Sequence, residues 1–157
     1  MRETIIETPV TYYTPDELSA ADRELVGRAV EATRNAYAPY SHFHVGAAIR
    51  LEGGEIVSGA NQENAAFPSG TCAERTACYY AHAAHPDKRF EAIAIAARDA
   101  DGNLTRTVTA PCGACRQALL EYETLAGRPV KVLLVADGEI ALLPSVKSLL
   151  PLAFTEF

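Results

Sequence analysis

The chain has 157 residues, of which 48% are apolar and 22% are charged, and its formal net charge is −6. The length suits one domain with a substantial core, and no apolar run approaches the roughly 18 residues of a membrane-spanning helix. Because nucleic-acid binders present basic patches, the acidic balance disfavours DNA or RNA as a partner. The acidic first residues lack the apolar region of a secretory signal, so we expect a cytoplasmic protein.

The N-terminal third is expected to contain a helix followed by a strand. Residues 1–13 are predicted to be an irregular or weakly extended lead-in to a single domain over 14–157. The segment Thr14-Pro15-Asp16-Glu17 is typical of a helix start, with Thr as the cap, Pro in the first turn and Glu three residues after the cap. The helix should end near Tyr37, and the alternation of apolar and polar residues over 43–51 then predicts a strand.

The middle of the chain alternates between turn signals and regular elements. Gly53-Gly54 predicts a turn, after which residues 55–60 should return as the paired strand. Residues 61–71 are predicted to form a loop, because they are rich in Asn, Pro, Ser and Gly. The alanine-rich segment 73–84 favours a helix, and the unbroken apolar run over 92–97 fits a strand that is buried on both faces.

The C-terminal third continues the alternation of helices and strands. Residues 113–123 predict a helix, residues 130–135 and 140–143 predict strands, and Ser145 can cap a final short helix. Strands that alternate with helices imply an α/β fold in which helices cover a sheet, here of roughly five strands.

The cysteines carry the strongest chemical signal. The chain has four of them, Cys72, Cys78, Cys112 and Cys115, and a disulfide framework is not expected in a chain of this length without a secretory signal. Three thiolates, from Cys72, Cys112 and Cys115, can hold a zinc ion and leave its fourth position open for water. Alone, the Cys-x-x-Cys pair would also suit a redox dithiol or half of a structural zinc site. Cys78 is expected to fill core space.

Glu74 follows the first of these thiols by two residues. A zinc ion lowers the pKa of its bound water to about 7, and a carboxylate at this position could move the protons of that water. The alternative is a first-turn Glu that only complements the helix dipole. The combination of Cys-x-Glu with Cys-x-x-Cys favours zinc-dependent hydrolysis.

Longer motifs around these residues resemble the cytidine deaminases of nucleoside salvage. They are Phe43-x-Val45-Gly46-Ala47-Ala48, Asn61-Gln62-Glu63-Asn64-Ala65, Thr71-Cys72-Ala73-Glu74-Arg75-Thr76-Ala77 and Pro111-Cys112-Gly113-Ala114-Cys115-Arg116-Gln117. The similarity covers roughly residues 18–154. It implies a three-layer α/β/α fold with a mixed sheet, one zinc ion per chain held by three cysteines, and a catalytic role for Glu74 as the proton shuttle.

The resemblance also implies roles for residues around the metal. Asn61 would bind a ribose hydroxyl and Glu63 the pyrimidine edge. Phe43 would pack beside the ribose and base, and the backbone N–H of Ala73 would bind the pyrimidine carbonyl. Arg75 would donate hydrogen bonds to zinc-bound sulfur and offset its negative charge. Without the cysteine motifs, Asn61 and Glu63 would suit a polar turn. Phe43 would suit an inward strand position and Arg75 a surface ion pair.

The resemblance further implies a homotetramer, in which neighbouring chains complete each pocket. Phe67 stands where relatives often have Tyr, and Phe154 lies in a tail segment that can reach a partner's active site in the family. Either residue would otherwise only pack locally. Two histidine pairs, expected to be ordinary surface or core residues rather than metal ligands, are His42 with His44 and His82 with His85.

The resemblance therefore predicts a zinc-dependent hydrolase that deaminates cytidine and 2′-deoxycytidine. Its partner would be a small nucleoside, with no role for nucleic acid or a membrane. One alternative keeps the chemistry and changes the substrate to another nucleoside or an aminonucleoside antibiotic. A more remote alternative is a non-catalytic zinc-binding module.

Overall fold

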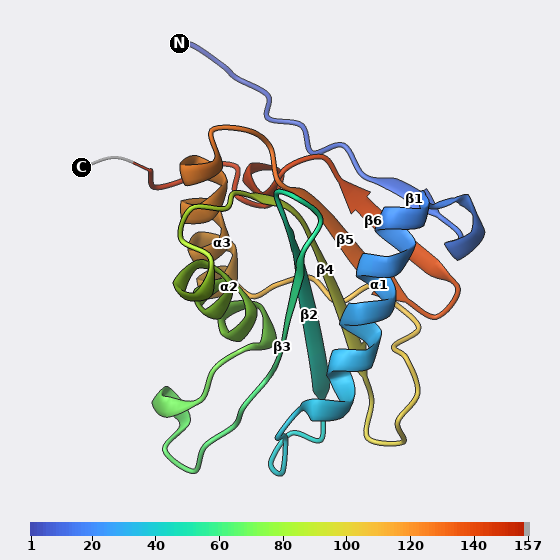
Figure 1. The fold of residues 1–157 in the computed structure, drawn as a ribbon. Helices are drawn as coiled ribbons and strands as arrows, with labels where there is room; N and C mark the ends of the chain where they lie inside the picture. Colours follow the sequence, from blue (N-terminus) through green and yellow to red (C-terminus); the bar gives the residue numbers. More distant parts are fainter. Residues whose placement is uncertain (156–157) are drawn as a thin grey trace.

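The computed structural model describes residues 1–155, and residues 156–157 of the expected domain lie outside the described residues. Within the described chain, six strands form one mixed sheet that is flanked by three α-helices (Figure 1). The strands are β1 (Thr11–Tyr13), β2 (His44–Leu51), β3 (Ile56–Ala60), β4 (Phe90–Arg98), β5 (Lys131–Ala136) and β6 (Glu139–Leu143). The helices are α1 (Ala20–Ala32), α2 (Ala73–Ala84) and α3 (Gly113–Ala126). None of the helices in residues 1–155 is both long and apolar enough to cross a membrane.

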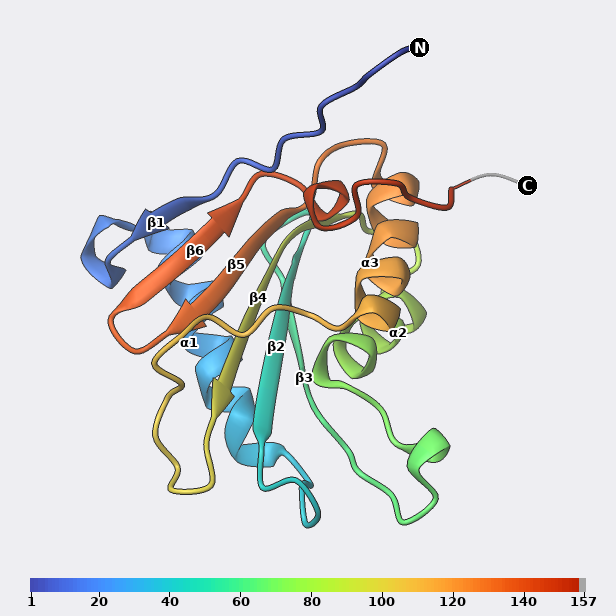
Figure 2. The same ribbon diagram turned by 180° about the vertical axis from the view of Figure 1, so that it is seen from behind.

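The sheet has the strand order β1-β6-β5-β4-β2-β3, with β4 and β5 parallel and the other neighbours antiparallel. Helix α1 covers one face, and helices α2 and α3 cover the other (Figure 1, Figure 2). Strand β4 is buried along most of its length because it lies in the middle of the sheet with helices on both sides. This arrangement confirms the expected three-layer α/β/α fold.

Two glycines on neighbouring strands let helices lie directly on the sheet. A Cβ atom at Gly59 on β3 would lie 2.5 Å from the backbone nitrogen of Ala77 on α2. A Cβ atom at Gly46 on β2 would lie 2.2 Å from the carbonyl oxygen of Ala29 on α1. A side chain at either position would therefore push a helix away from the sheet. Gly59 in particular sets how closely the first turns of α2 approach β3.

The N-terminal prediction was wrong in two respects. Residues 1–13 were expected to be an irregular or weakly extended lead-in, but Thr11–Tyr13 form β1, which pairs with β6 and gives the described sheet six strands instead of roughly five. A three-residue strand is too short to show a period, and its partner lies at the other end of the chain. The expected first helix is divided into a 3₁₀ turn over Pro15–Glu17 and α1, which Ser19 caps by accepting a hydrogen bond from the Asp22 amide.

Candidate metal centre

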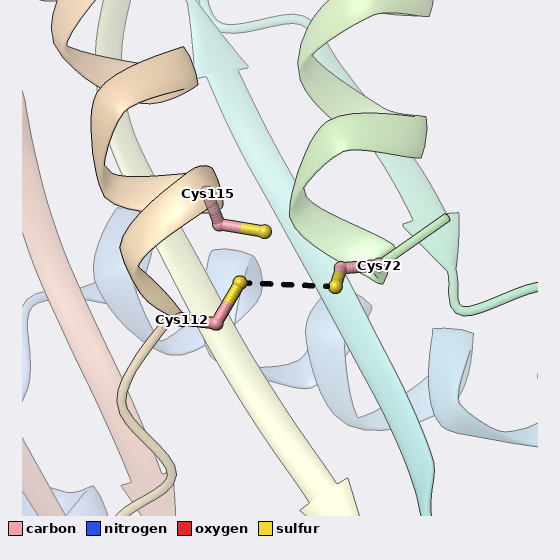
Figure 3. Close-up of side chains that lie close together, drawn as sticks. All are labelled: Cys72, Cys112 and Cys115. Carbon is pink, nitrogen blue, oxygen red and sulfur yellow. Dashed lines mark hydrogen bonds between the residues drawn. The ribbon is translucent and has the colours of Figure 1, made fainter. Parts of the chain in front are cut away.

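Three cysteine side chains meet where the N-terminal ends of α2 and α3 come together. Cys72 is the N-cap residue of α2 and Cys112 that of α3, and Cys115 lies in the first turn of α3. Within the described residues, their Sγ atoms all lie within 4.8 Å of one another, and the Sγ atoms of Cys72 and Cys112 are 4.0 Å apart (Figure 3). Four tetrahedral ligands with Zn–S bonds of 2.3 Å would hold sulfur atoms about 3.8 Å apart. The cluster therefore fits a zinc ion.

The surroundings of Cys72 favour its thiolate. Both helix N-termini present partial positive charge to the sulfur atoms, and Arg75 Nη2 lies 3.9 Å from the Sγ of Cys72. Hydrogen bonds from Cys115 and then from Arg75 lower the pKa of the Cys72 thiol to about 5. The fourth cysteine is separate from the cluster, and burial raises the pKa of Cys78 to about 12. Cys78 is thus a core residue, as its place in the sequence suggested.

Glu74 is buried at the same helix end, with only 4% of its surface exposed. It is the second residue of α2, so its position follows directly from that of Cys72. Burial raises the pKa of the Glu74 carboxyl, and the neighbouring charge of Cys72 acts in the same direction. A raised pKa makes a carboxylate a better proton acceptor than an ordinary one, which suits a general acid–base group.

A cavity of about 700 Å³ opens beside the cluster. It brings together most of the residues that the sequence singled out, because the loops after β3 and before β2 face the N-terminal end of α2. Its lining includes Phe43, Asn61, Glu63, Phe67, Cys72 and Glu74. Cavities of this size, with few polar groups among apolar ones, are typical of small-molecule sites.

Asn61 and Glu63 are fixed by the backbone of the segment that leads into β2. Asn61 Oδ1 accepts from the Val45 amide at 2.8 Å, and its Nδ2 donates to the Phe43 carbonyl at 2.9 Å. Glu63 Oε2 accepts from the amides of Tyr40 and Ser41 at 2.9 and 3.3 Å. Hydrogen bonds from the Ser41 hydroxyl and the Tyr40 amide lower the pKa of Glu63. Both side chains are therefore held toward the cavity, and Glu63 is held as a carboxylate.

Some expected residues lie away from this constellation. Phe154 is 65% exposed, and its carbonyl accepts a hydrogen bond from Gln117 Nε2. Within the described chain, the metal-binding cluster contains no histidine; His85, for example, contacts Glu55 at 3.1 Å. Sequence reasoning also missed contributors to the cavity, namely Tyr40, Ser41, Thr109 and Ala110. Their loops carry no periodic signal, and only their proximity to the motifs could have suggested them.

An α/β/α domain that presents three thiolates and a buried carboxylate beside an open cavity belongs to the class of zinc-dependent hydrolases. Residues 19–127 match the family model for the cytidine and deoxycytidylate deaminase zinc-binding region. The chain belongs to this family, and the zinc ligands are Cys72, Cys112 and Cys115.

Individual relatives agree with this assignment. The chain is 42% identical over 136 residues to a cytidine deaminase of Halalkalibacterium halodurans, covering 85% of this chain and 95% of that protein. It is 31% identical over 140 residues to a blasticidin-S deaminase of Bacillus cereus, covering 88% of this chain and 95% of that protein. A crystal structure of cytidine deaminase from Burkholderia pseudomallei superposes with a TM-score of 0.70 at 38% identity, covering 83% of this chain and 97% of that one.

Proposed function

We propose that this protein hydrolyses cytidine and 2′-deoxycytidine to uridine and 2′-deoxyuridine, with release of ammonia. The observation that carries the proposal is the position of Glu74, a buried carboxyl that lies in the first turn of the helix capped by the zinc ligand Cys72 and lines the cavity. Membership of the deaminase family and the similarity to cytidine deaminases support the choice of substrate.

Glu74 is proposed to move two protons during the reaction. When bound, zinc lowers the pKa of water toward neutrality and so supplies the nucleophile. Glu74 accepts the first proton of that water as the water oxygen bonds to C4, and gives the proton to N3 as the C4=N3 double bond becomes single. It then transfers the second proton to the exocyclic amine, so that the C4–N bond breaks as the C4–O bond becomes a carbonyl. The atoms balance: one water enters, one ammonia leaves, and Glu74 ends in its starting state.

The remaining site residues are proposed to orient the nucleoside. The reacting C4 has to lie at the end of the cavity that holds Glu74, so the ribose extends toward the rim. Asn61 and Glu63 are then placed to bind ribose hydroxyls, and this assignment replaces the pyrimidine edge expected for Glu63. Ala73 is the first residue of α2, so its N–H has no acceptor within the helix and is proposed to bind the pyrimidine carbonyl. Phe43 would pack against the sugar and base.

The test is the substitution Glu74→Gln, with Glu24→Gln on the exposed side of α1 as the matched control. Loss of the proton shuttle should lower kcat for cytidine by about 10²- to 10⁴-fold, while zinc content stays at one ion per chain. The control should keep both. Turnover by the Glu74→Gln variant within tenfold of the unmodified chain would refute the mechanism. Zinc-loaded protein that turns over no pyrimidine nucleoside would refute the function.

A second substrate class is supported by one observation, the similarity to a blasticidin-S deaminase over most of both chains. The same zinc site and Glu74 would then act on the cytosine ring of an aminonucleoside. Side-by-side kinetics with cytidine, 2′-deoxycytidine and blasticidin S separates the two. A higher kcat/KM for blasticidin S would move the assignment to the antibiotic.

We also propose that the protein acts as a homotetramer in the cytoplasm. Phe67 is 75% exposed although it lines the cavity, and its ring contacts that of Tyr40 edge-to-face with centroids 6.0 Å apart. Exposed aromatic rings at the mouth of a site suit contact with a neighbouring chain, and Phe154 is a second candidate. Zinc-binding thiolates also have to stay reduced, as they do in the cytoplasm. A monomeric mass for the active, zinc-loaded sample would refute the assembly.

A further inference from the structure

The side chain of Arg116 joins two segments that are distant in the sequence. Arg116 follows the zinc ligand Cys115 on α3, and its guanidinium group is half-buried. Its Nε donates to the carbonyl of Pro111 at 2.8 Å, and its Nη1 donates to the carbonyl of Leu149 at 3.0 Å. Arg75 behaves differently, because its Nη2 points at a sulfur atom of the cluster. Arg116 thus donates to one backbone oxygen just before Cys112 and to another in the C-terminal segment.

The zinc-binding turn, defined here as residues 111–114, has little other support. Cys112, Gly113 and Ala114 are exposed, and an added Cβ at Gly113 would meet no described atom within 4 Å. Among the described residues, no side-chain hydrogen bond caps α3 at Cys112. Pro111 is buried, so packing fixes the first residue of the turn but none of the three exposed residues that follow it. The bond from Arg116 to Pro111 is the polar contact that reaches the residue immediately before this ligand.

The second acceptor of Arg116, the carbonyl of Leu149, is held firmly by its surroundings. Leu149 is the last residue of a 3₁₀ helix over Val146–Leu149. The buried carboxylate of Glu123 holds the start of that helix by accepting from the Val146 amide at 2.7 Å and from the Ser145 hydroxyl at 2.6 Å. Val146 is fully buried and Leu149 nearly so. The Leu149 carbonyl therefore has a fixed position against which the turn can be held.

We propose that Arg116 is a positioning residue for zinc, which holds the Cys112 ligand in place by bridging the zinc-binding turn to the C-terminal segment. The proposal depends on the geometry of two hydrogen bonds and not on the positive charge alone. A guanidinium group has several donors in a fixed fork and can satisfy both carbonyls, whereas a lysine ammonium is a single point charge. Groups that orient metal ligands typically change metal affinity by about 10- to 100-fold when they are removed.

The experiment compares zinc release from Arg116→Lys and Arg116→Gln with release from the unmodified chain. Zinc-loaded protein is mixed with excess chromogenic chelator, without substrate, and the release rate is measured. Both variants should release zinc at least fivefold faster, on the basis of the effect expected for an orienting group. Arg128→Gln is the matched control, since the ion pairs of Arg128 within residues 1–155 are those with Glu52 and Glu91. Its release rate should match that of the unmodified chain.

The outcomes distinguish an effect of the two hydrogen bonds of Arg116 on zinc release from an effect of its positive charge. Unchanged release from both Arg116 variants overturns the proposal. Unchanged release from Arg116→Lys with fast release from Arg116→Gln assigns the effect to charge and also overturns it. Should Arg116→Gln fail to fold, the Lys variant decides alone. Because no turnover is measured, a chain that holds zinc through Arg116 and does not deaminate cytidine would refute the proposed function and leave this inference standing.

Discussion

The close contact between Gly59 and α2 gives a sharp test of how the fold positions the site. Replacing Gly59 by Ala adds a Cβ atom 2.5 Å from the Ala77 nitrogen and 2.9 Å from the Ala73 carbonyl oxygen. Ordinary van der Waals contacts of a Cβ atom begin at 3.4 Å. Both obstructing atoms belong to the helix backbone, so no side chain can rotate away. The first turns of α2 therefore have to move outward by about 1 Å, the difference between these distances.

This displacement should affect activity more than stability. Overpacking of this kind costs about 1–3 kcal/mol of the free energy of unfolding, which most domains tolerate. The moving turn, however, carries Cys72 and Glu74, whereas Cys112 and Cys115 stay with α3. Zinc–ligand distances tolerate only about 0.2 Å of error, and a 1 Å misplacement of reacting groups can cost about 100-fold in rate.

The assay measures kcat/KM for cytidine, zinc content and chemical unfolding on the same preparations. Gly59→Ala should lower kcat/KM by about 100-fold or more, and zinc retention should fall with it. Gly27→Ala is the matched control, because Gly27 lies in α1 and an added Cβ meets no described atom within 4 Å. The control should keep its activity and gain about 0.5–1 kcal/mol from helix propensity. A Gly59→Ala variant with unchanged kcat/KM would refute the reasoning.

Two further predictions concern stability. His42 is the one non-glycine residue of the described chain with a positive φ, at 53°. His42→Gly should raise the free energy of unfolding by up to about 1 kcal/mol, and His42→Val should lower it. Urea titration measures both changes. A destabilising His42→Gly would contradict this. Buried Asp22 forms ion pairs with Lys131 at 2.7 Å and Arg50 at 3.1 Å. Burial raises the pKa of the Asp22 carboxyl, but the hydrogen bond and the charge of Lys131 lower it. With the hydrogen bonds from Ser19 and Arg50, the net effect is a lowered pKa. Asp22→Asn should therefore cost about 2 kcal/mol at pH 7, the scale of a hydrogen bond to a charged group. The difference should shrink as pH falls below the unfolded-state pKa of about 4 and through the folded-state value. A difference that is the same at pH 7 and pH 3 would contradict the pairing.

The sequence predicted the elements whose signals are local. The alanine-rich segment gave a helix with the observed bounds, Ala73–Ala84, because its start is marked by a change of composition and its end by His85-Pro86. The zinc ligands could also be predicted from the sequence, since each cysteine motif places its thiols at a helix start that the sequence indicates. The two cysteine motifs lie on helices that pack against the same sheet. The alternation in 43–51 and the apolar run over 92–97 were enough to predict that sheet.

The parts that the sequence did not predict depend on contacts between distant segments. Strand β1 exists because β6 offers it an edge, and nothing within residues 11–13 signals that pairing. The hydrogen bonds from the Tyr40 and Ser41 amides to Glu63 join a turn to a loop that follows a whole hairpin. The motif identified Glu63 as a site residue, but only the structure indicates that its carboxylate is bound by the Tyr40 and Ser41 amides. The bridge from Arg116 to Leu149 is of the same kind.

Two arginines near the metal centre, Arg75 and Arg116, differ in what their guanidinium groups contact. Three thiolates around a dication leave one excess negative charge, which would weaken the ability of zinc to acidify water. The N-termini of α2 and α3, each with about half an elementary charge, and the guanidinium of Arg75, at 3.9 Å from Cys72 Sγ, all act against this excess charge. Nε and Nη1 of Arg116 donate to carbonyl oxygens and not to the sulfur atoms. The proposed division of roles is therefore that Arg75, which follows Glu74, tunes the metal and Arg116, which follows Cys115, holds a ligand in place.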